Sequence, residues 1–154
     1  RRRHTRYISV TGVQTCALPI CFAADGEVVR DRETGLEWRR CALGTRWDGK
    51  DCAGARAFLG LDAAEAAAAQ EGDGWRLPDI KELYQLLDDD CGTPPVDRVG
   101  FPDLVSGRDE EDVYWTTTPM DLADLWYCVE FQHGFADGHS RGISLAVRLV
   151  RKPK

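Results

Sequence analysis

The helical patterns of this sequence are confined to one stretch, residues 62–87, and β patterns lie on both sides of it. The β-type runs are residues 26–30, 35–39, 113–118, 125–132 and 142–152. In the last run Ile143, Leu145, Val147 and Leu149 alternate with Ser144, Ala146 and Arg148, which predicts a strand with the two sets on opposite faces. Because helices and strands come in separate runs, the sequence predicts an α+β domain with two short helices, an antiparallel β meander and long loops.

The two predicted helices have recognisable beginnings. Residues 62–70 are mainly alanine, which has the highest helix propensity, and Asp62 stands where an N-cap is expected. Asp79 begins a second helix that runs to about residue 87, and Glu82 follows it in a capping-box arrangement. The apolar residues of this second helix recur at helical spacing and must be buried: Ile80, Leu83, Tyr84 and Leu87.

Residues 1–21 do not read as natural protein sequence. Back-translation of residues 10–20 matches a common sequencing-library adapter codon for codon, and residues 1–6 match the opening of the same adapter. We therefore predict that residues 1–21 are a disordered, translated artefact and that the domain spans residues 22–154. The alternative is a natural basic N-terminal arm that binds nucleic acid or an anionic membrane.

The charge of the chain limits its partners. The full chain has a net charge of −6, and four basic residues but no acidic ones lie in residues 1–20, so the remainder carries −10. This negative charge argues against nucleic-acid binding and against binding to anionic membranes. No apolar run approaches the roughly 20 residues of a membrane span, so we predict no transmembrane segment.

Four cysteines remain after residue 21, namely Cys41, Cys52, Cys91 and Cys128. An even number of cysteines in a small domain favours disulfides over buried free thiols or a zinc site. Zinc sites usually contain close cysteine pairs, whereas ten residues separate Cys41 from Cys52. We predict the pairs Cys41–Cys52 and Cys91–Cys128.

Three polar loops are the candidate binding regions: residues 103–112, 119–124 and 133–141. Binding residues often lie on loops that a rigid scaffold positions. The candidate binding residues in these loops are Asp109, Asp112, Asp121, Asp124, His133, Asp137, His139 and Arg141.

The sequence contains no recognisable catalytic set, and we expect neither an enzyme nor a resident metal or cofactor. His133, Asp137 and His139 share one hairpin and have side chains that bind metals, but polar residues of a hairpin loop are usually only solvated, and this is the simpler interpretation. The acidic residues 88–90 could coordinate calcium or pair with Arg76, although a solvated helix end is the simpler interpretation.

Several motifs together resemble a known family. They are TGLEW at residues 34–38, Arg40-Cys41 with WDG at residues 47–49 and Cys52, WRLPDIKEL at residues 75–83, Phe101-Pro102, YWTTTP at residues 114–119, YCVEF at residues 127–131 with Gly134, and VRLVR at residues 147–151. In this order they resemble the C-terminal domain of the collagen-like bacterial adhesin Lcl. Two departures stand out: the chain contains no collagen-like repeat, and Cys128 stands where the family more often has an aliphatic residue.

The resemblance implies a C-type-lectin-like fold and an extracytoplasmic location on a secreted, periplasmic or cell-surface bacterial protein. It also implies a non-enzymatic binding module for a glycan or protein ligand on a cell surface or matrix, with a role in adhesion. A structural or display domain of a surface assembly is the alternative, and a lectin-fold enzyme is a third. The founding adhesin's association with sulfated polysaccharides transfers poorly, because a charge of −10 would repel sulfate groups.

Overall fold

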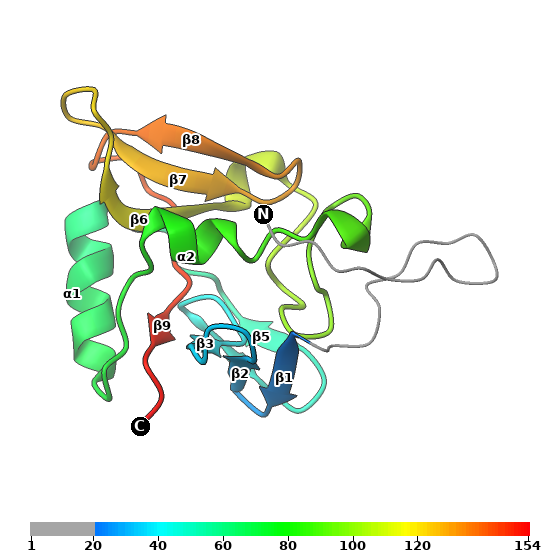
Figure 1. Cartoon of the computed structure of the whole chain (residues 1–154). Helices are drawn as coiled ribbons and strands as arrows, with labels where there is room; N and C mark the ends of the chain where they lie inside the picture. Colours follow the sequence, from blue (N-terminus) through cyan, green and yellow to red (C-terminus); the bar gives the residue numbers. More distant parts are fainter. Residues whose placement is uncertain (1–20) are drawn as a thin grey trace.

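A computed structural model describes residues 21–154 as a mixed α+β domain (Figure 1). Its elements in chain order are β1 (Phe22–Asp25), β2 (Val28–Asp31), β3 (Glu37–Arg39), β4 (Thr45–Trp47), β5 (Cys52–Gly54), α1 (Leu61–Glu71), α2 (Ile80–Tyr84), the 3-10 helices η1 (Asp89–Cys91) and η2 (Asp109–Glu111), β6 (Val113–Pro119), β7 (Trp126–Glu130), β8 (Phe135–His139) and β9 (Val150–Arg151). The α+β prediction is confirmed. The predicted artefact lies outside the described residues except at Cys21, which is buried.

Three small antiparallel sheets organise the described residues. Their strand orders are β1-β2-β3-β9, β4-β5 and β6-β7-β8. Helix α2 packs against β6 and β7, and Figure 1 shows α1 standing beside the same three-stranded sheet. The predicted meander is therefore present, but its third strand is β8 rather than the C-terminal run.

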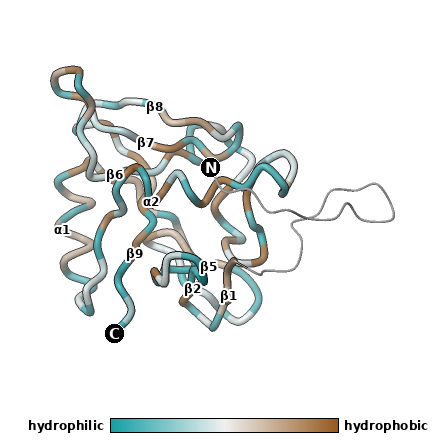
Figure 2. The backbone as a smooth tube through the Cα atoms, viewed as in Figure 1, coloured by the Kyte–Doolittle hydropathy of each residue, from teal (hydrophilic) through white to brown (hydrophobic). Residues whose placement is uncertain are grey.

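The C-terminal run departs most from its predicted pattern. Residues 145–150 are all buried, and only the two-residue strand β9 joins a sheet, beside β3. The run passes through the centre of the domain and bonds to segments on both sides, including Leu43, Leu59 and Trp115. Figure 2 shows this hydrophobic stretch (brown) ending in a hydrophilic tail (teal). The long strand predicted over residues 142–152 is thus reduced to β9, and neighbouring segments cover both faces of residues 145–150.

The WRLPDIKEL motif builds the start of α2. Asp79 accepts a hydrogen bond from the Glu82 N–H, and the Glu82 carboxylate accepts one from the Asp79 N–H, so the predicted capping box is confirmed. Arg76 donates to both Glu82 oxygens at 2.8 Å, rather than pairing with residues 88–90. Helix α2 ends at Tyr84, three residues earlier than predicted.

Helix α1 begins one residue before the predicted start. Its N-cap is Gly60, which supplies no side-chain cap, and Asp62 instead pairs with Arg141. The helix buries only Leu61, Ala64 and Ala68, because its remaining residues are mostly small or charged. Its alanine-rich surface leaves room for a cleft on one side.

A disulfide closes the β4–β5 hairpin. Cys41 and Cys52 are bonded, as predicted, and the segment expected to be a loop contains these two short strands. The second predicted pair is wrong: Cys128 is a buried free thiol, while Cys91 is disulfide-bonded to a different partner. Burial raises the pKa of Cys128 to about 12, with a further contribution from the nearby Asp137 charge, which favours the protonated thiol at neutral pH.

Removing the Cys41–Cys52 disulfide is expected to lower the free energy of unfolding by about 3 kcal/mol. The bond closes a short loop, and the loss of its constraint on the unfolded chain accounts for this value. Denaturant unfolding of the Cys41→Ser/Cys52→Ser variant under non-reducing conditions measures the change. A variant as stable as the parent protein would contradict the prediction.

Candidate functional site

A cleft of about 540 Å³ lies between α1 and the segment that connects β3 to β4. Its volume is within the range of about 300–1,000 Å³ that is typical of small-molecule sites. The residues that line it are Glu27, Arg39, Cys41, Ala42, Leu43, Gly44, Thr45, Arg46, Trp47, Ala57, Leu59, Ala67, Gln70, Glu71 and Leu149. It is a candidate for a binding site in the described part of the chain.

The apolar lining of the cleft comes from four separate segments. Leu43, Leu59 and Leu149 contribute aliphatic side chains, and Ala67 of α1 contributes only a methyl group. Gly44 allows the β3–β4 connection to approach this lining closely: its φ is +94°, and a Cβ there would lie 2.4 Å from the carbonyl oxygen of Ala55. A larger residue at Gly44 would therefore force this wall outward.

A three-residue ion-pair cluster, Glu27–Arg39–Glu71, forms part of the rim. Arg39 donates to Glu27 at 3.0 Å and to Glu71 of α1 at 3.1 Å, and its guanidinium lies 4.6 Å from the centre of the Trp75 ring. The cluster joins the β1–β2 turn, β3 and α1 across the rim. Both carboxylates of the cleft lining, those of Glu27 and Glu71, are therefore paired with Arg39.

Trp47 forms a fixed aromatic wall. The guanidinium of Arg40 lies 3.5 Å from the centre of the Trp47 ring, and Arg40 also donates to the carbonyl oxygens of Gly26 and Val99. Burial lowers the pKa of Arg40, while the charge of Asp97 acts in the opposite direction. Because the Arg40 guanidinium donates hydrogen bonds to two backbone carbonyls, it holds the Trp47 ring in place before any ligand binds.

Two polar side chains of the lining have no hydrogen-bond or ion-pair partner within residues 21–154. Neither Arg46 nor Gln70 makes a side-chain hydrogen bond or ion pair within residues 21–154, and both are exposed. Among the charged residues that line the cleft, Arg39 pairs with both Glu27 and Glu71. Arg46 is therefore the charged residue of the lining that has no ion-pair partner within residues 21–154.

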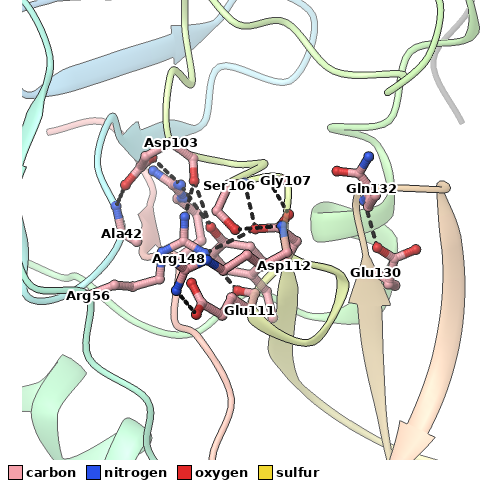
Figure 3. Close-up of polar contacts among 12 residues, drawn as sticks. Ala42, Arg56, Asp103, Ser106, Gly107, Glu111, Asp112, Glu130, Gln132 and Arg148 are labelled. Atoms are coloured by element: carbon pink, nitrogen blue, oxygen red, sulfur yellow. Dashed lines mark hydrogen bonds and ion pairs between the residues drawn. The ribbon is translucent and has the colours of Figure 1, made fainter.

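A buried polar network supports the cleft from beneath (Figure 3). Arg148 is fully buried, pairs with Asp103 at 2.6 Å, and donates to the backbone carbonyls of Arg39 and Arg40. Asp103 in turn accepts hydrogen bonds from the Ala42 N–H at 2.8 Å and the Thr45 hydroxyl at 3.3 Å. The network thus fixes the backbone that carries the cleft residues.

The predicted binding residues in the first loop are not arranged as a surface site. Asp112 is fully buried and pairs with Arg56 at 3.2 Å, and it accepts hydrogen bonds from the Ser106 and Gly107 N–H groups. Asp112 therefore holds the loop closed. Asp109 lies in η2, and its side chain is outside the described set.

Three of the other predicted residues lie in β8 or just after it. Asp137 and His139 approach to 3.5 Å, and the guanidinium of Arg141 lies 4.9 Å from the centre of the Trp126 ring. Trp126 is the register partner of His139, so these four side chains gather at one end of the hairpin.

The remaining three predicted residues lie in the connections on either side of β7. Asp121 and Asp124 are exposed in the β6–β7 connection. His133 lies at the opposite end of β8, where it approaches the Glu130 carboxylate to 3.2 Å. None of the predicted binding residues lines the cleft.

The acidic residues 88–90 form a local turn rather than a cage of ligands. Asp88 is buried and accepts a hydrogen bond from the Asp90 N–H. In the described part of the chain, one group of three potential metal ligands converges within 4.8 Å: Cys41, Cys52 and Asp103. Both sulfurs of that group are joined in the disulfide, so neither is available as a thiolate ligand.

The fold and the cleft define a small disulfide-bonded α+β domain with a preformed concave site. The family model of the Lcl C-terminal domain matches residues 27–151, and the chain therefore belongs to this family. A comparison with curated proteins found no match. No helix within residues 21–154 is both long and apolar enough to cross a membrane.

Proposed function

We propose that this domain is a non-enzymatic ligand-binding module of an exported, surface-associated bacterial protein, and that the cleft beside α1 is its binding site. The observation that carries the proposal is the fixed Trp47 wall, which faces a cleft lined by apolar side chains and a few polar groups. Such a lining is typical of preformed ligand sites. The family is named after an adhesin domain, which favours a glycan or protein ligand on a cell surface or matrix.

Two further parts of the proposal rest on chemistry and architecture. A binding role without catalysis is supported by the pairing of both cleft carboxylates, Glu27 and Glu71, with Arg39, which gives each of them a structural role at the rim. The disulfide supports an extracytoplasmic location, since disulfides persist in oxidising compartments. We also propose a C-type-lectin-like fold, supported by two short helices, small antiparallel sheets and long connections.

Filling the cleft from α1 is expected to abolish ligand binding without unfolding the domain. Ala67→Tyr places a large side chain in the cleft, whereas the matched variant Ala63→Tyr alters an exposed position of the same helix outside the lining. Both changes replace alanine by the same residue, so their effects on helix propensity are equivalent. Thermal melting checks that both variants fold, and a glycan array followed by titration calorimetry measures binding.

The contrast between the two variants decides the proposal. Binding that Ala67→Tyr removes and Ala63→Tyr preserves would support the cleft as the site. Equal binding by both variants would place the ligand elsewhere, with the Asp137, His139 and Arg141 end of the β7–β8 hairpin as the next candidate. A folded parent protein that binds no glycan or surface protein would favour a structural or display domain.

A further inference from the structure

We propose that the Cys41–Cys52 disulfide is a redox-controlled latch on one wall of the cleft. Reduction of this bond by a dithiol releases the β4–β5 hairpin, which carries Trp47, while the rest of the domain stays folded. The release follows from the way the hairpin is anchored. Its role in regulation rests on the proposed function, because the hairpin is a wall of the proposed binding cleft.

The β4–β5 hairpin is weakly attached to the rest of the domain. It forms a two-stranded sheet of its own, and neither strand pairs with any other strand of residues 21–154. None of residues 45–54 belongs to the two apolar clusters that form the core, and every residue of both strands is exposed or half-buried. An isolated two-stranded hairpin is only marginally stable in water, so this segment depends on what ties it to the core.

The disulfide is the covalent tie between the hairpin and the core. Cys52 is the register partner of Trp47, so the bond holds the residue directly opposite the aromatic wall. At the other end of the bond Cys41 is 7 % exposed, and the next residue, Ala42, is fully buried and donates its N–H to Asp103 at 2.8 Å. The bond therefore joins a marginally stable hairpin to a buried part of the fold.

The contacts that remain after reduction are individually weak. Arg40 still stacks on the Trp47 ring, but a single cation–π contact to a half-buried ring contributes little free energy. The Thr45 hydroxyl donates to the Ala42 carbonyl at 2.8 Å and approaches Asp103 at 3.3 Å. These hydrogen bonds lie at the base of the hairpin, and they do not hold the strand residues beyond it.

Both ends of the hairpin are fixed independently of the disulfide. The Leu43 N–H donates to the Val147 carbonyl at 2.9 Å, and the Ala57 N–H donates to the Leu43 carbonyl at 2.8 Å. Arg56 pairs with Asp112 at 3.2 Å. Because Val147 and Asp112 are fully buried, the release stops at the base of the hairpin.

The reducing step is a thiol–disulfide exchange. A thiolate of the dithiol attacks the sulfur of Cys52, which is half-buried whereas Cys41 is buried, and Cys41 leaves as a thiolate that takes up a proton. The second thiol of the reductant then displaces Cys52. The products are two cysteine thiols and the oxidised, cyclic form of the reductant.

Hydrogen exchange of the full chain tests the latch. Amide exchange is measured for the oxidised parent, for the parent treated with dithiothreitol, and for Cys41→Ser/Cys52→Ser without a reductant. The control Cys91→Ser removes a disulfide-bonded cysteine that lies outside the hairpin. Alkylation of the folded, treated parent, followed by mass spectrometry, reports whether Cys41 and Cys52 have been reduced.

The expected result is a local loss of protection. Amides of residues 45–54 should exchange within about 10-fold of the rate of unstructured peptide in the reduced parent and in the double variant, while amides of β6 and β7 remain strongly protected. In the oxidised parent and in Cys91→Ser, residues 45–54 exchange more slowly, and at the same rates in both proteins.

Four results would overturn the proposal: hairpin amides that keep the parent's protection in the double variant, an equal loss of protection in β6 and β7, release of the hairpin by Cys91→Ser, or a Cys41–Cys52 bond that dithiothreitol does not reduce in the folded chain. The proposed function fails separately, because the Ala67→Tyr contrast measures binding by the oxidised protein. Release of the hairpin in a domain whose cleft binds nothing would establish the latch and contradict its role in regulating a binding site.

Discussion

Replacing Arg148 by methionine is expected to lower the free energy of unfolding by about 3–5 kcal/mol, the usual effect of removing one partner of a buried ion pair. Arg148 is fully buried, and the side chain of its partner Asp103 is 13 % exposed. Methionine would fill much of the volume but would leave the Asp103 carboxylate and the carbonyls of Arg39 and Arg40 without this donor. Denaturant unfolding measures the loss.

Two further variants separate the buried charge from a general effect of losing an arginine. Arg30→Met removes an arginine whose side chain is 61 % exposed in its pair with Glu37, and is expected to cost under about 1 kcal/mol. Adding Asp103→Asn to Arg148→Met is expected to recover part of the loss, because the uncompensated charge is removed. Equal losses in Arg30→Met and Arg148→Met would contradict the role assigned to this network.

The pH dependence of stability provides an independent measurement of the same pair. Burial acts to raise the pKa of Asp103, but the charge of Arg148, the Ala42 N–H and the charge of Arg56 outweigh it and hold the pKa below its ordinary value of 3.8. A carboxyl group with a lowered pKa in the folded state contributes stability above its unfolded pKa and loses it as pH falls through the folded pKa. Below about pH 4, stability should therefore fall less steeply in the Arg148→Met/Asp103→Asn variant than in the parent chain.

The sequence predicted the parts of the fold that depend on local signals. The capping box of α2, the apolar stripe at Leu83 and the disulfide between Cys41 and Cys52 each follow from residues close together in the chain. Period-two alternation predicted one long strand over residues 142–152, but only the two residues of β9 join a sheet. In the fold, other segments cover both faces of this run, including the face of Arg148.

The cleft could not be predicted from the sequence, since its lining comes from segments far apart in the chain. Ala67, Leu149 and Trp47 meet only after folding, and no motif marks them as a group. The sequence instead predicted acidic loop residues as the binding site. One of them, Asp112, is buried and pairs with Arg56. Arg148 lies within an otherwise apolar run. Its position was the one local sign in the sequence of the polar network beneath the cleft.

Truncating Trp115 to alanine is expected to cost about 3–5 kcal/mol, a large share of the total stability of a domain of this size. Trp115 lies in β6, is fully buried, and packs in the apolar cluster that contains Cys128 and Leu145. Its indole N–H also donates to the carbonyl oxygen of Leu59 at 2.7 Å. Truncation therefore leaves a cavity and removes one of the two hydrogen bonds that the Leu59 carbonyl accepts, the other coming from the Leu145 N–H.

Two comparisons make the Trp115 prediction specific. Trp115→Phe retains most of the packing but loses the hydrogen bond to Leu59, so it should cost less than Trp115→Ala. Asp121→Ala, in the exposed β6–β7 connection, should change stability by less than about 0.5 kcal/mol. Denaturant midpoints with unchanged m-values would report these differences as stability alone. A Trp115→Ala protein with the parent's stability that had lost only ligand binding would show that this aromatic residue belongs to a binding site rather than to the core.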